Sequence, residues 1–218
     1  MEKVDLKKIL SLLLDFKGEK IKGYCLERLQ EGADAYEIFN ELSLGLEEIG
    51  KGYENEKEKR YFTSDLIVSG RNMKRAIEIL KPHIKSKKSV NEKGVVLLGT
   101  VKGDVHDIGK MIVGITLEAN GFRVIDLGVD VDKERFVKKV DEINPDILGL
   151  SALLTSTAPY MKEVIEALKS HNLRDKVKVI VGGRAVTENL ALKWGADAYA
   201  QDSIDGLKKC LALIGERV

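Results

Sequence analysis

Cysteine is scarce in this chain, which has only Cys25 and Cys210 among its 218 residues. The two lie far apart and neither belongs to a Cys-x-x-Cys pair, so we expect buried or free thiols in a reducing compartment rather than a disulfide. A zinc site needs three or four ligands at suitable spacing. His83 and His171 do not supply that spacing, and we interpret both as ordinary surface residues.

Long apolar runs and an excess of charge of one sign are missing as well. The chain is 44% apolar and 33% charged, and its early apolar run Ile9–Leu14 is short and broken by Ser11, so we expect a cytoplasmic protein with no membrane span. The 36 Lys and Arg residues nearly balance the 35 Asp and Glu residues, which argues against a nucleic-acid groove. The local basic run Lys85–Lys88 is interpreted as solvated charge in a linker.

Residues 1–84 carry apolar side chains at helical spacing, which predicts amphipathic helices. The apolar residues of three such helices, with the glycines that end them, are Leu6, Ile9, Leu10, Leu13 and Gly18; Ile21, Cys25, Leu29 and Gly32; Ile38, Leu42, Leu46, Ile49 and Gly52. A fourth helix is predicted to begin at Thr63 or Ser64, either of which can cap it, and to end around Pro82. Four helices with short connections indicate an antiparallel four-helix bundle.

After a polar segment at residues 85–93, short β-branched or apolar runs alternate with helical segments. These runs are Val95–Leu98, Val124–Leu127, Ile147–Leu150, Val177–Val181 and the weaker Ala198–Ala200. Strands alternating with helices predict an α/β fold with a doubly wound parallel sheet, Rossmann-like or flavodoxin-like. We therefore expect a helical domain at residues 1–88 and an α/β domain at residues 89–218. The loops that leave the strands then lie at one edge of the sheet, where such folds bind ligands.

The loop between the first predicted strand and a helix predicted at Met111–Ala119 holds the octapeptide Gly103–Lys110, in which Asp104 and His106 are two residues apart. An imidazole near a carboxylate has the parts of a metal ligand and its supporting partner, because one ring nitrogen can coordinate while the other donates to the carboxylate. The alternative for a single loop histidine is a purely structural role.

Two further loops at the same edge carry candidate binding groups. The loop Ser151–Thr157 has hydroxyls at Ser151, Thr155 and Thr157, which can bond a polar ligand or simply cap a helix. The Gly182-Gly183 pair lets backbone approach a large flat or elongated group, or simply forms a turn. Each signal is weak by itself, and their order along the chain is the informative feature.

That order resembles the cobalamin-binding domain shared by cobalamin-dependent methionine synthase, the corrinoid proteins of methylamine, methanol and methoxy-aromatic methyltransferase systems, and adenosylcobalamin mutases. The pattern is Asp-x-His-x-x-Gly at Asp104–Gly109, then Ser-x-Leu at Ser151–Leu153, then Gly-Gly, and it covers roughly residues 90–215. The helical part, with Tyr61-Phe62 leading into residues 77–82, resembles the cap bundle of the methyl-transferring members.

The resemblance implies a role toward cobalamin for each matching residue. His106 would be the lower axial cobalt ligand, and Asp104 would hold its other ring nitrogen. Thr157, where the methionine synthase pattern has Ser, would extend that relay. Ser151 and Thr155 would bond the displaced nucleotide tail. The other residues expected to line the cofactor are Asp107, Ile108, Gly109, Leu153, Gly182 and Gly183.

The cap favours the methyl-transferring members, so the resemblance implies a corrinoid methyl carrier without a complete active site of its own. It would hold cobalamin or a related corrinoid, in the methylcobalamin form during turnover. A substrate-specific methyltransferase subunit would supply the methyl group, a second methyltransferase would remove it, and a reductive activation protein would be a further partner. The linker at residues 85–93 would be the hinge on which the cap moves. No residue specifies the methyl donor.

Other interpretations of the pattern stay open at this point. A subunit of an adenosylcobalamin-dependent mutase would share the α/β domain, although the cap bundle argues against it. A cobalamin-dependent sensor or regulator would share both parts, yet no basic recognition helix precedes the bundle. A flavodoxin-like receiver would need a phosphoacceptor Asp after the third strand, where this chain has Ser151.

Overall fold

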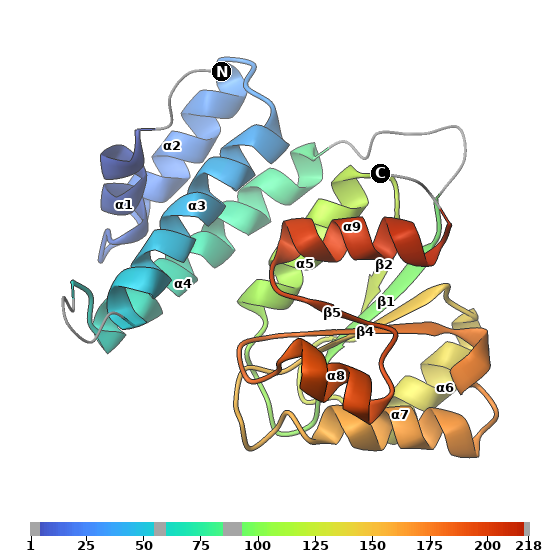
Figure 1. Cartoon of the computed structure of the whole chain (residues 1–218). Coiled ribbons are helices and arrows are strands. Elements are labelled where there is room, and N and C mark those ends of the chain that lie inside the picture. The colour runs from blue at the N-terminus through green and yellow to red at the C-terminus, as the bar shows by residue number, and fades with distance from the viewer. Residues whose placement is uncertain (1–4, 55–59, 85–92, 216–218) are drawn as a thin grey trace. The chain divides into compact units, whose positions relative to one another are not determined.

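The computed structural model describes residues 5–54, 60–84 and 93–215, and the chain divides into two compact units, Met1–Lys85 and Ser86–Val218 (Figure 1). Apart from Lys93, the predicted linker and hinge at residues 85–93 lies outside the described residues. None of the helices within the described ranges is long and apolar enough to cross a membrane.

The first unit is helical, as the spacing of its apolar residues predicts. Its elements are α1 (Leu6–Leu13), α2 (Glu19–Gln30), α3 (Ala35–Glu54), α4 (Thr63–Leu80) and the short 3-10 helix η1 (Lys81–His83). Helix α3 packs against α1 and α4, and α2 packs against α4. The residues buried in this unit include Ile9, Leu13, Ile21, Ile38 and Leu42, all of which belong to the predicted apolar stripes.

The predicted break at Gly52 is wrong, because α3 continues through this residue to Glu54. A Cβ atom at Gly52 would lie only 2.6 Å from Cδ2 of Tyr61. The missing side chain therefore allows the Tyr61 ring to pack directly on the helix. A glycine that permits close packing cannot be told from a helix-ending glycine by its place in the sequence.

The predicted cap of the fourth helix is also wrong, because neither Thr63 nor Ser64 occupies the N-cap position. Phe62 stands there, and its N–H donates to Oδ2 of Asp65 over 2.8 Å. An acidic side chain in the first turn can satisfy a free N–H by reaching back, and it also suits the positive end of the helix dipole. Asp65 thus supplies the stabilisation expected from a capping hydroxyl.

The second unit is a five-stranded parallel sheet with flanking helices, as predicted. Its strands are β1 (Val95–Thr100), β2 (Arg123–Asp126), β3 (Ile147–Ser151), β4 (Lys178–Gly182) and β5 (Ala198–Ala200). Its helices are α5 (Ile108–Ala119), α6 (Lys133–Ile143), α7 (Tyr160–Ser170), η2 (Arg174–Lys176), α8 (Glu188–Trp194) and α9 (Ser203–Leu213). The strand order β2-β1-β3-β4-β5 is that of the flavodoxin-like doubly wound fold, whose connections reverse direction between β1 and β3.

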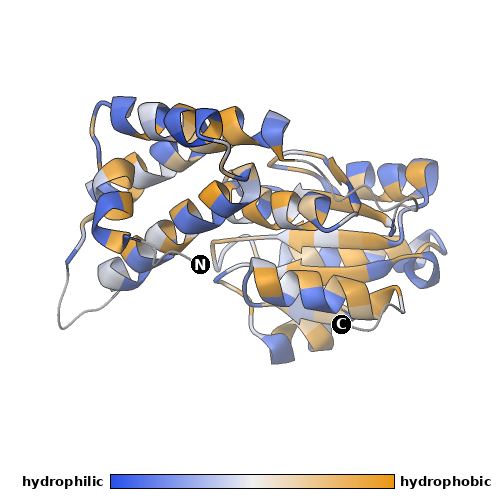
Figure 2. Ribbon diagram, turned by 90° about the horizontal axis from the view of Figure 1, so that it is seen from above, coloured by the Kyte–Doolittle hydropathy of each residue, from blue (hydrophilic) through white to orange (hydrophobic). Residues whose placement is uncertain are grey.

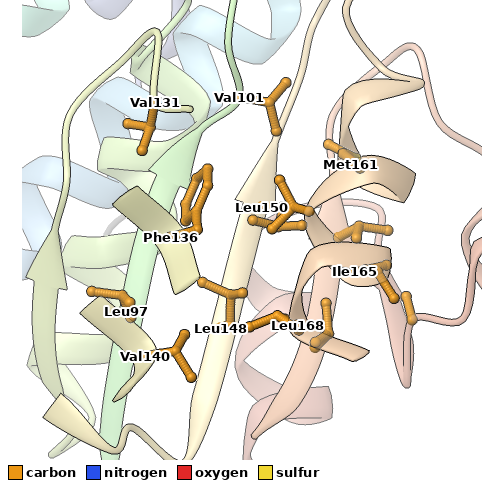
Figure 3. Packing of buried hydrophobic residues seen from close by; sticks show 14 of the residues in the cluster. Leu97, Val101, Val131, Phe136, Val140, Leu148, Leu150, Met161, Ile165 and Leu168 are labelled. Carbon is orange, nitrogen blue, oxygen red and sulfur yellow. The ribbon is translucent and has the colours of Figure 1, made fainter. Parts of the chain in front are cut away.

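Both faces of the sheet are covered by helices, which explains why its strands are almost continuously apolar. On one face, Leu97 belongs to a buried cluster that also contains Phe136 of α6 and Ile165 of α7 (Figure 3). On the other face, Val96 lies in a separate cluster with Leu117 of α5. In Figure 2, which is coloured by hydropathy, the strands are mostly hydrophobic, whereas the helices also carry hydrophilic residues on part of their surface.

The helix after β1 begins earlier than predicted. Helix α5 starts at Ile108 rather than Met111, with Asp107 at its N-cap position. The loop between β1 and α5 is therefore only residues 101–107, and the last part of the predicted octapeptide loop is the first turn of a helix. A shorter loop holds His106 between two regular elements.

Cys25 and Cys210 are both free and buried. Burial raises the pKa of each thiol to about 12. Both thiols are therefore neutral at physiological pH and are poor nucleophiles. His83 and His171 are both exposed, as predicted.

Candidate functional site

The loops after β1 and β3 meet at the carboxyl edge of the sheet, where the direction of the connections reverses. The two strands pair up to Thr100 and Ser151, and the N–H of Val101 donates to the carbonyl of Ser151 over 3.0 Å just beyond them. Open α/β sheets bind their ligands in the crevice at this point. The sheet topology therefore brings the loop at residues 101–107 beside the loop at residues 152–159.

Asp104 is the centre of a hydrogen-bond network, and its side chain is fully buried. Its Oδ1 accepts the backbone N–H of His106 over 3.0 Å and lies 2.7 Å from Nδ1 of the His106 ring. Its Oδ2 accepts the N–H groups of Leu153 and Leu154 over 2.8 and 3.2 Å, and the hydroxyl of Thr157 over 2.8 Å. The network therefore joins residues that are about fifty positions apart in the sequence.

Two opposing effects act on the pKa of Asp104. Burial raises it, but the hydrogen bonds from the His106 N–H, the Thr157 hydroxyl, the His106 ring and the Leu153 N–H together outweigh burial and hold the pKa well below its usual range. The carboxylate is therefore ionised at any physiological pH. An ionised carboxylate only accepts hydrogen bonds, and the partners of Asp104 named above can all donate.

His106 has one ring nitrogen engaged and the other free to bind. Because Asp104 can only accept, the proton of the neutral ring belongs on Nδ1, which leaves the lone pair on Nε2. The side chain is 47% exposed, so the ring is accessible although its partner is buried. The hydroxyl of Thr100 donates to the His106 carbonyl over 3.1 Å and holds the backbone. This is the arrangement of an imidazole metal ligand oriented by a carboxylate.

The predicted glycines shape the same edge in two different ways. At Gly183, where φ is +117°, a Cβ atom would lie 2.0 Å from the carbonyl oxygen of Ala152, so the turn after β4 presses against the loop after β3. At Gly182 a Cβ atom would lie 3.2 Å from the carbonyl oxygen of Ala200. At Gly109 a Cβ atom would meet nothing within 4 Å. Close packing thus explains the glycine pair, whereas Gly109 borders open space at the start of α5.

The other predicted site residues belong to the same edge of the sheet. They are Asp107 and Ile108 at the start of α5, Ser151 at the end of β3, and Leu153 and Thr155 in the loop that follows β3. Leu153 is 37% exposed, and Val105, next to His106 in the chain, is 68% exposed. The accessible imidazole is therefore flanked by apolar side chains that an apolar ligand can cover.

This donor set fits a metal that is already held by an organic ligand. In the part of the chain that the structure describes, no three His, Cys, Asp or Glu side chains gather to hold a bare metal ion. A single imidazole with a carboxylate partner could offer only one ligand to a metal, so the other ligands would have to come from an organic group such as a macrocycle. The exposed apolar side chains of Val105 and Leu153 and the open space at Gly109 suit a group of that size.

Two residues that hold the His106 loop were not foreseen from the sequence. Thr100 is fully buried and bonds the His106 carbonyl. Asp130, in the loop after β2, accepts the N–H of Gly103 over 2.7 Å and donates its own N–H to the carbonyl of Asp104 over 3.0 Å. Neither residue belongs to the shared pattern. The sequence signal that places them here is their position at the carboxyl ends of two predicted strands.

Comparison with known proteins shows the family to which the chain is similar. Two family models, each described as a B12 binding domain, match residues 94–207 and residues 5–81. A corrinoid protein of Desulfitobacterium hafniense is 43% identical over 178 residues, which cover 80% of this chain and 81% of that protein. Dimethylamine corrinoid protein 1 of Methanosarcina acetivorans is 39% identical over 190 residues, which cover 87% of this chain and 88% of that protein.

Solved structures show the same relationship. The monomethylamine corrinoid protein of Methanosarcina barkeri has a TM-score of 0.80 and 32% identity, and the match covers 94% of this chain and 96% of that one. The methanol:cobalamin methyltransferase complex MtaBC of the same organism has a TM-score of 0.55 and 28% identity over 98% of this chain and 80% of that one. Fold and site together define a cobalamin-binding protein. More particularly, the chain belongs to the family of corrinoid proteins of methyltransferase systems.

Proposed function

We propose that this protein is a methyl carrier, which receives a methyl group on the cobalt of its bound corrinoid from a substrate-specific methyltransferase and passes it to a second methyltransferase. The observation that carries the proposal is the 2.7 Å contact between His106 Nδ1 and Asp104, which leaves Nε2 available to bind the cobalt from below. The relatives named for dimethylamine and monomethylamine, and the solved complex named for methanol, support methyltransferases as partners.

The bound corrinoid supplies a cobalt that accepts and gives up the methyl group. In the proposed carrier, His106 would hold the cobalt through Nε2, with the proton of the neutral ring on Nδ1 facing Asp104. The Thr157 hydroxyl bonds the other carboxylate oxygen and keeps the carboxylate in place for the His106 ring.

The remaining parts of the proposal concern the domains and the partners. We assign residues 1–88 as the cap and residues 89–218 as the cobalamin-binding domain, because the two B12 binding domain models match within these ranges. Ser151 and Thr155 are the proposed hydroxyl partners of the nucleotide tail. A reductive activation protein, which returns oxidised cobalt to the methyl-accepting state, is the third proposed partner. Two free cysteines suit the reducing cytoplasm.

His106→Ala tests the ligand assignment. The protein is loaded with hydroxocobalamin, its visible spectrum is recorded, and the electron paramagnetic resonance spectrum is recorded after reduction to cob(II)alamin. We expect the variant to lose the nitrogen coupling and to show the spectrum of a cofactor without a lower base. The dissociation constant should rise by no more than about tenfold, because the apolar and backbone contacts stay.

His171→Ala is the matched control, since this exposed histidine already has Nδ1 2.8 Å from the carbonyl oxygen of Ala167. It should leave both spectra unchanged. If His106→Ala also left them unchanged, the ligand assignment would be refuted.

The carrier is further distinguished from a mutase subunit by the upper ligand that protein purified from cobalamin-producing cells retains. A methyl group supports the carrier, and an adenosyl group contradicts it.

Gly109→Ala tests whether the open space at the start of α5 belongs to the cofactor. Alanine is favoured over glycine inside a helix by up to about 1 kcal/mol, and the new methyl group meets nothing within 4 Å, so the cofactor-free protein should be as stable as wild type or slightly more stable. If the nucleotide tail passes this position, the dissociation constant for hydroxocobalamin should rise at least about tenfold.

Gly23→Ala in α2 is the matched control, because a Cβ atom there also meets nothing within 4 Å. It should give a similar change in the thermal midpoint with no change in affinity. An unchanged cobalamin affinity in Gly109→Ala would remove Gly109 from the residues that line the cofactor.

A further inference from the structure

The loop after β2 forms hydrogen bonds with two successive residues of the loop that carries His106. Oδ1 of Asp130 accepts the N–H of Gly103 over 2.7 Å, and the N–H of Asp130 donates to the carbonyl of Asp104 over 3.0 Å. Gly103 has a φ of +81°, so the chain turns sharply just before Asp104. The two bonds from Asp130 therefore hold this turn from both sides.

Asp130 makes both bonds because its own backbone is left-handed, with a φ of 53°. In the described residues only Asn144 and Asn172 share this feature among side-chain-bearing residues. A residue with a Cβ atom adopts this conformation at a cost, which Asp and Asn tolerate better than most. Backbone strain that persists in a native loop points to a structural demand at that position.

The loop that contains Asp130 is itself tied to β1. The N–H of Thr100 donates to the carbonyl of Gly128, and the N–H of Val131 donates to the carbonyl of Thr100, each over 3.0 Å. Val101 and Val131 also form an isolated parallel bridge. Asp130 is therefore held by the sheet on one side and holds Gly103 and Asp104 on the other. Asp130 thereby fixes the His106 loop relative to the sheet.

We propose that Asp130 is a positioning residue for the lower cobalt ligand. By fixing the backbone of Gly103 and Asp104, it sets the place of the Asp104 carboxylate and thereby the place of the His106 ring. A metal bond needs the donor nitrogen at a defined point, so greater mobility of this loop favours the form in which His106 is not coordinated. The inference rests on the proposed role of His106.

Asp130→Ala removes the acceptor for Gly103 and puts a poorly tolerated residue at a left-handed position. The protein is loaded with hydroxocobalamin and reduced to cob(II)alamin, and the nitrogen-coupled and uncoupled signals are compared with those of wild type at one fixed pH. Losing one hydrogen bond to a charged group should lower the ratio of coupled to uncoupled signal about fivefold relative to wild type. The affinity for cobalamin should stay within about tenfold of wild type.

Two variants at the same position separate the carboxylate from the backbone. Asp130→Asn tolerates the left-handed conformation and keeps an oxygen for the Gly103 N–H, so it should recover most of the wild-type ratio. Asp130→Gly relieves the strain without supplying an acceptor, so its ratio should stay low. Asp130→Gly also keeps the test decisive if Asp130→Ala folds poorly.

Asn144→Ala is the control for general destabilisation, because Asn144 is also left-handed, with a φ of 50°, at the C-cap of α6. It should lower the thermal midpoint and leave the ratio of coupled to uncoupled signal as in wild type. A wild-type ratio in Asp130→Ala and Asp130→Gly, or an equal loss in Asn144→Ala, would overturn the role of Asp130. If His106→Ala removes the coupling while the Asp130 variants keep it, this inference alone fails. If His106→Ala keeps the coupling, the ligand assignment and this inference both fail.

Discussion

Asp104→Ala is expected to lower the free energy of unfolding of the α/β domain by about 3 to 5 kcal/mol, because it removes the acceptor of a buried charged network. The substitution leaves the N–H groups of Leu153 and Leu154, the Thr157 hydroxyl and the His106 ring without their shared partner. Urea denaturation of the cofactor-free protein, followed by circular dichroism, measures the loss. The variant should also bind cobalamin without nitrogen coupling, since the His106 ring then lacks the carboxylate that orients it.

Asp132→Ala is the matched control for removing an aspartate from this domain. Asp132 caps α6, where its Oδ1 accepts the N–H of Arg135 over 2.8 Å at the protein surface. Losing such a cap costs about 1 kcal/mol. If Asp104→Ala were no more destabilising than Asp132→Ala, the five contacts of Asp104 would contribute no more than an ordinary cap.

The same network should leave a signature in acid. The folded protein holds the pKa of Asp104 below its usual range, so as the pH falls below about 4 the unfolded chain binds a proton that the folded chain does not. The stabilisation is therefore complete above that pH and is lost below it by about 1.4 kcal/mol per pH unit. Asp104→Asn cannot titrate. The stability difference between wild type and Asp104→Asn should stay constant at higher pH and shrink below pH 4.

Gly183→Ala is the second substitution with a large expected effect, a loss of about 3 to 5 kcal/mol in the free energy of unfolding. The backbone φ of +117° is unfavourable for alanine, and the new Cβ atom would lie 2.0 Å from the carbonyl oxygen of Ala152. Either the turn after β4 or the loop after β3 must move. Ala152 directly precedes Leu153, whose N–H binds Asp104, so cobalamin affinity should fall together with stability.

Gly128→Ala separates strain from collision. Gly128 also has a left-handed backbone, with a φ of +88°, but a Cβ atom there meets nothing within 4 Å. The substitution should cost only about 1 to 2 kcal/mol from the backbone. Urea unfolding of both variants, with hydroxocobalamin titration, makes the comparison. Equal losses for Gly183→Ala and Gly128→Ala would show that the contact with Ala152 does not limit the fold.

The strands were predictable because burial on both faces of a parallel sheet requires continuous apolar runs. The runs beginning at Val95 and Ile147 coincide with the starts of β1 and β3. The Asp104–His106 contact was also predictable, because residues two apart in a tight loop can reach each other without help from the rest of the chain. The roles of these residues toward cobalt stay predictions until the variants are measured.

Glycine and hydroxyl signals were less dependable. Gly52 was predicted to end a helix but lies inside α3 against the Tyr61 ring, whereas Gly183 turns sharply against Ala152. Thr63 is a good capping residue, but Asp65 supplies the first-turn hydrogen bond instead. In each case the backbone conformation or the cap depends on contacts with a residue nearby in the fold, which the local sequence preference does not specify.

The sequence by itself determined the elements whose signal is local, namely the helical and strand periods and the Asp-x-His spacing that orients one imidazole. Only the tertiary structure decided that the N–H groups of Leu153 and Leu154 bond Asp104 and that Asp130 holds Gly103. The reason is physical. A period reports which side chains of one element are buried, whereas these contacts depend on the order of the strands and on a left-handed residue that long-range packing sustains.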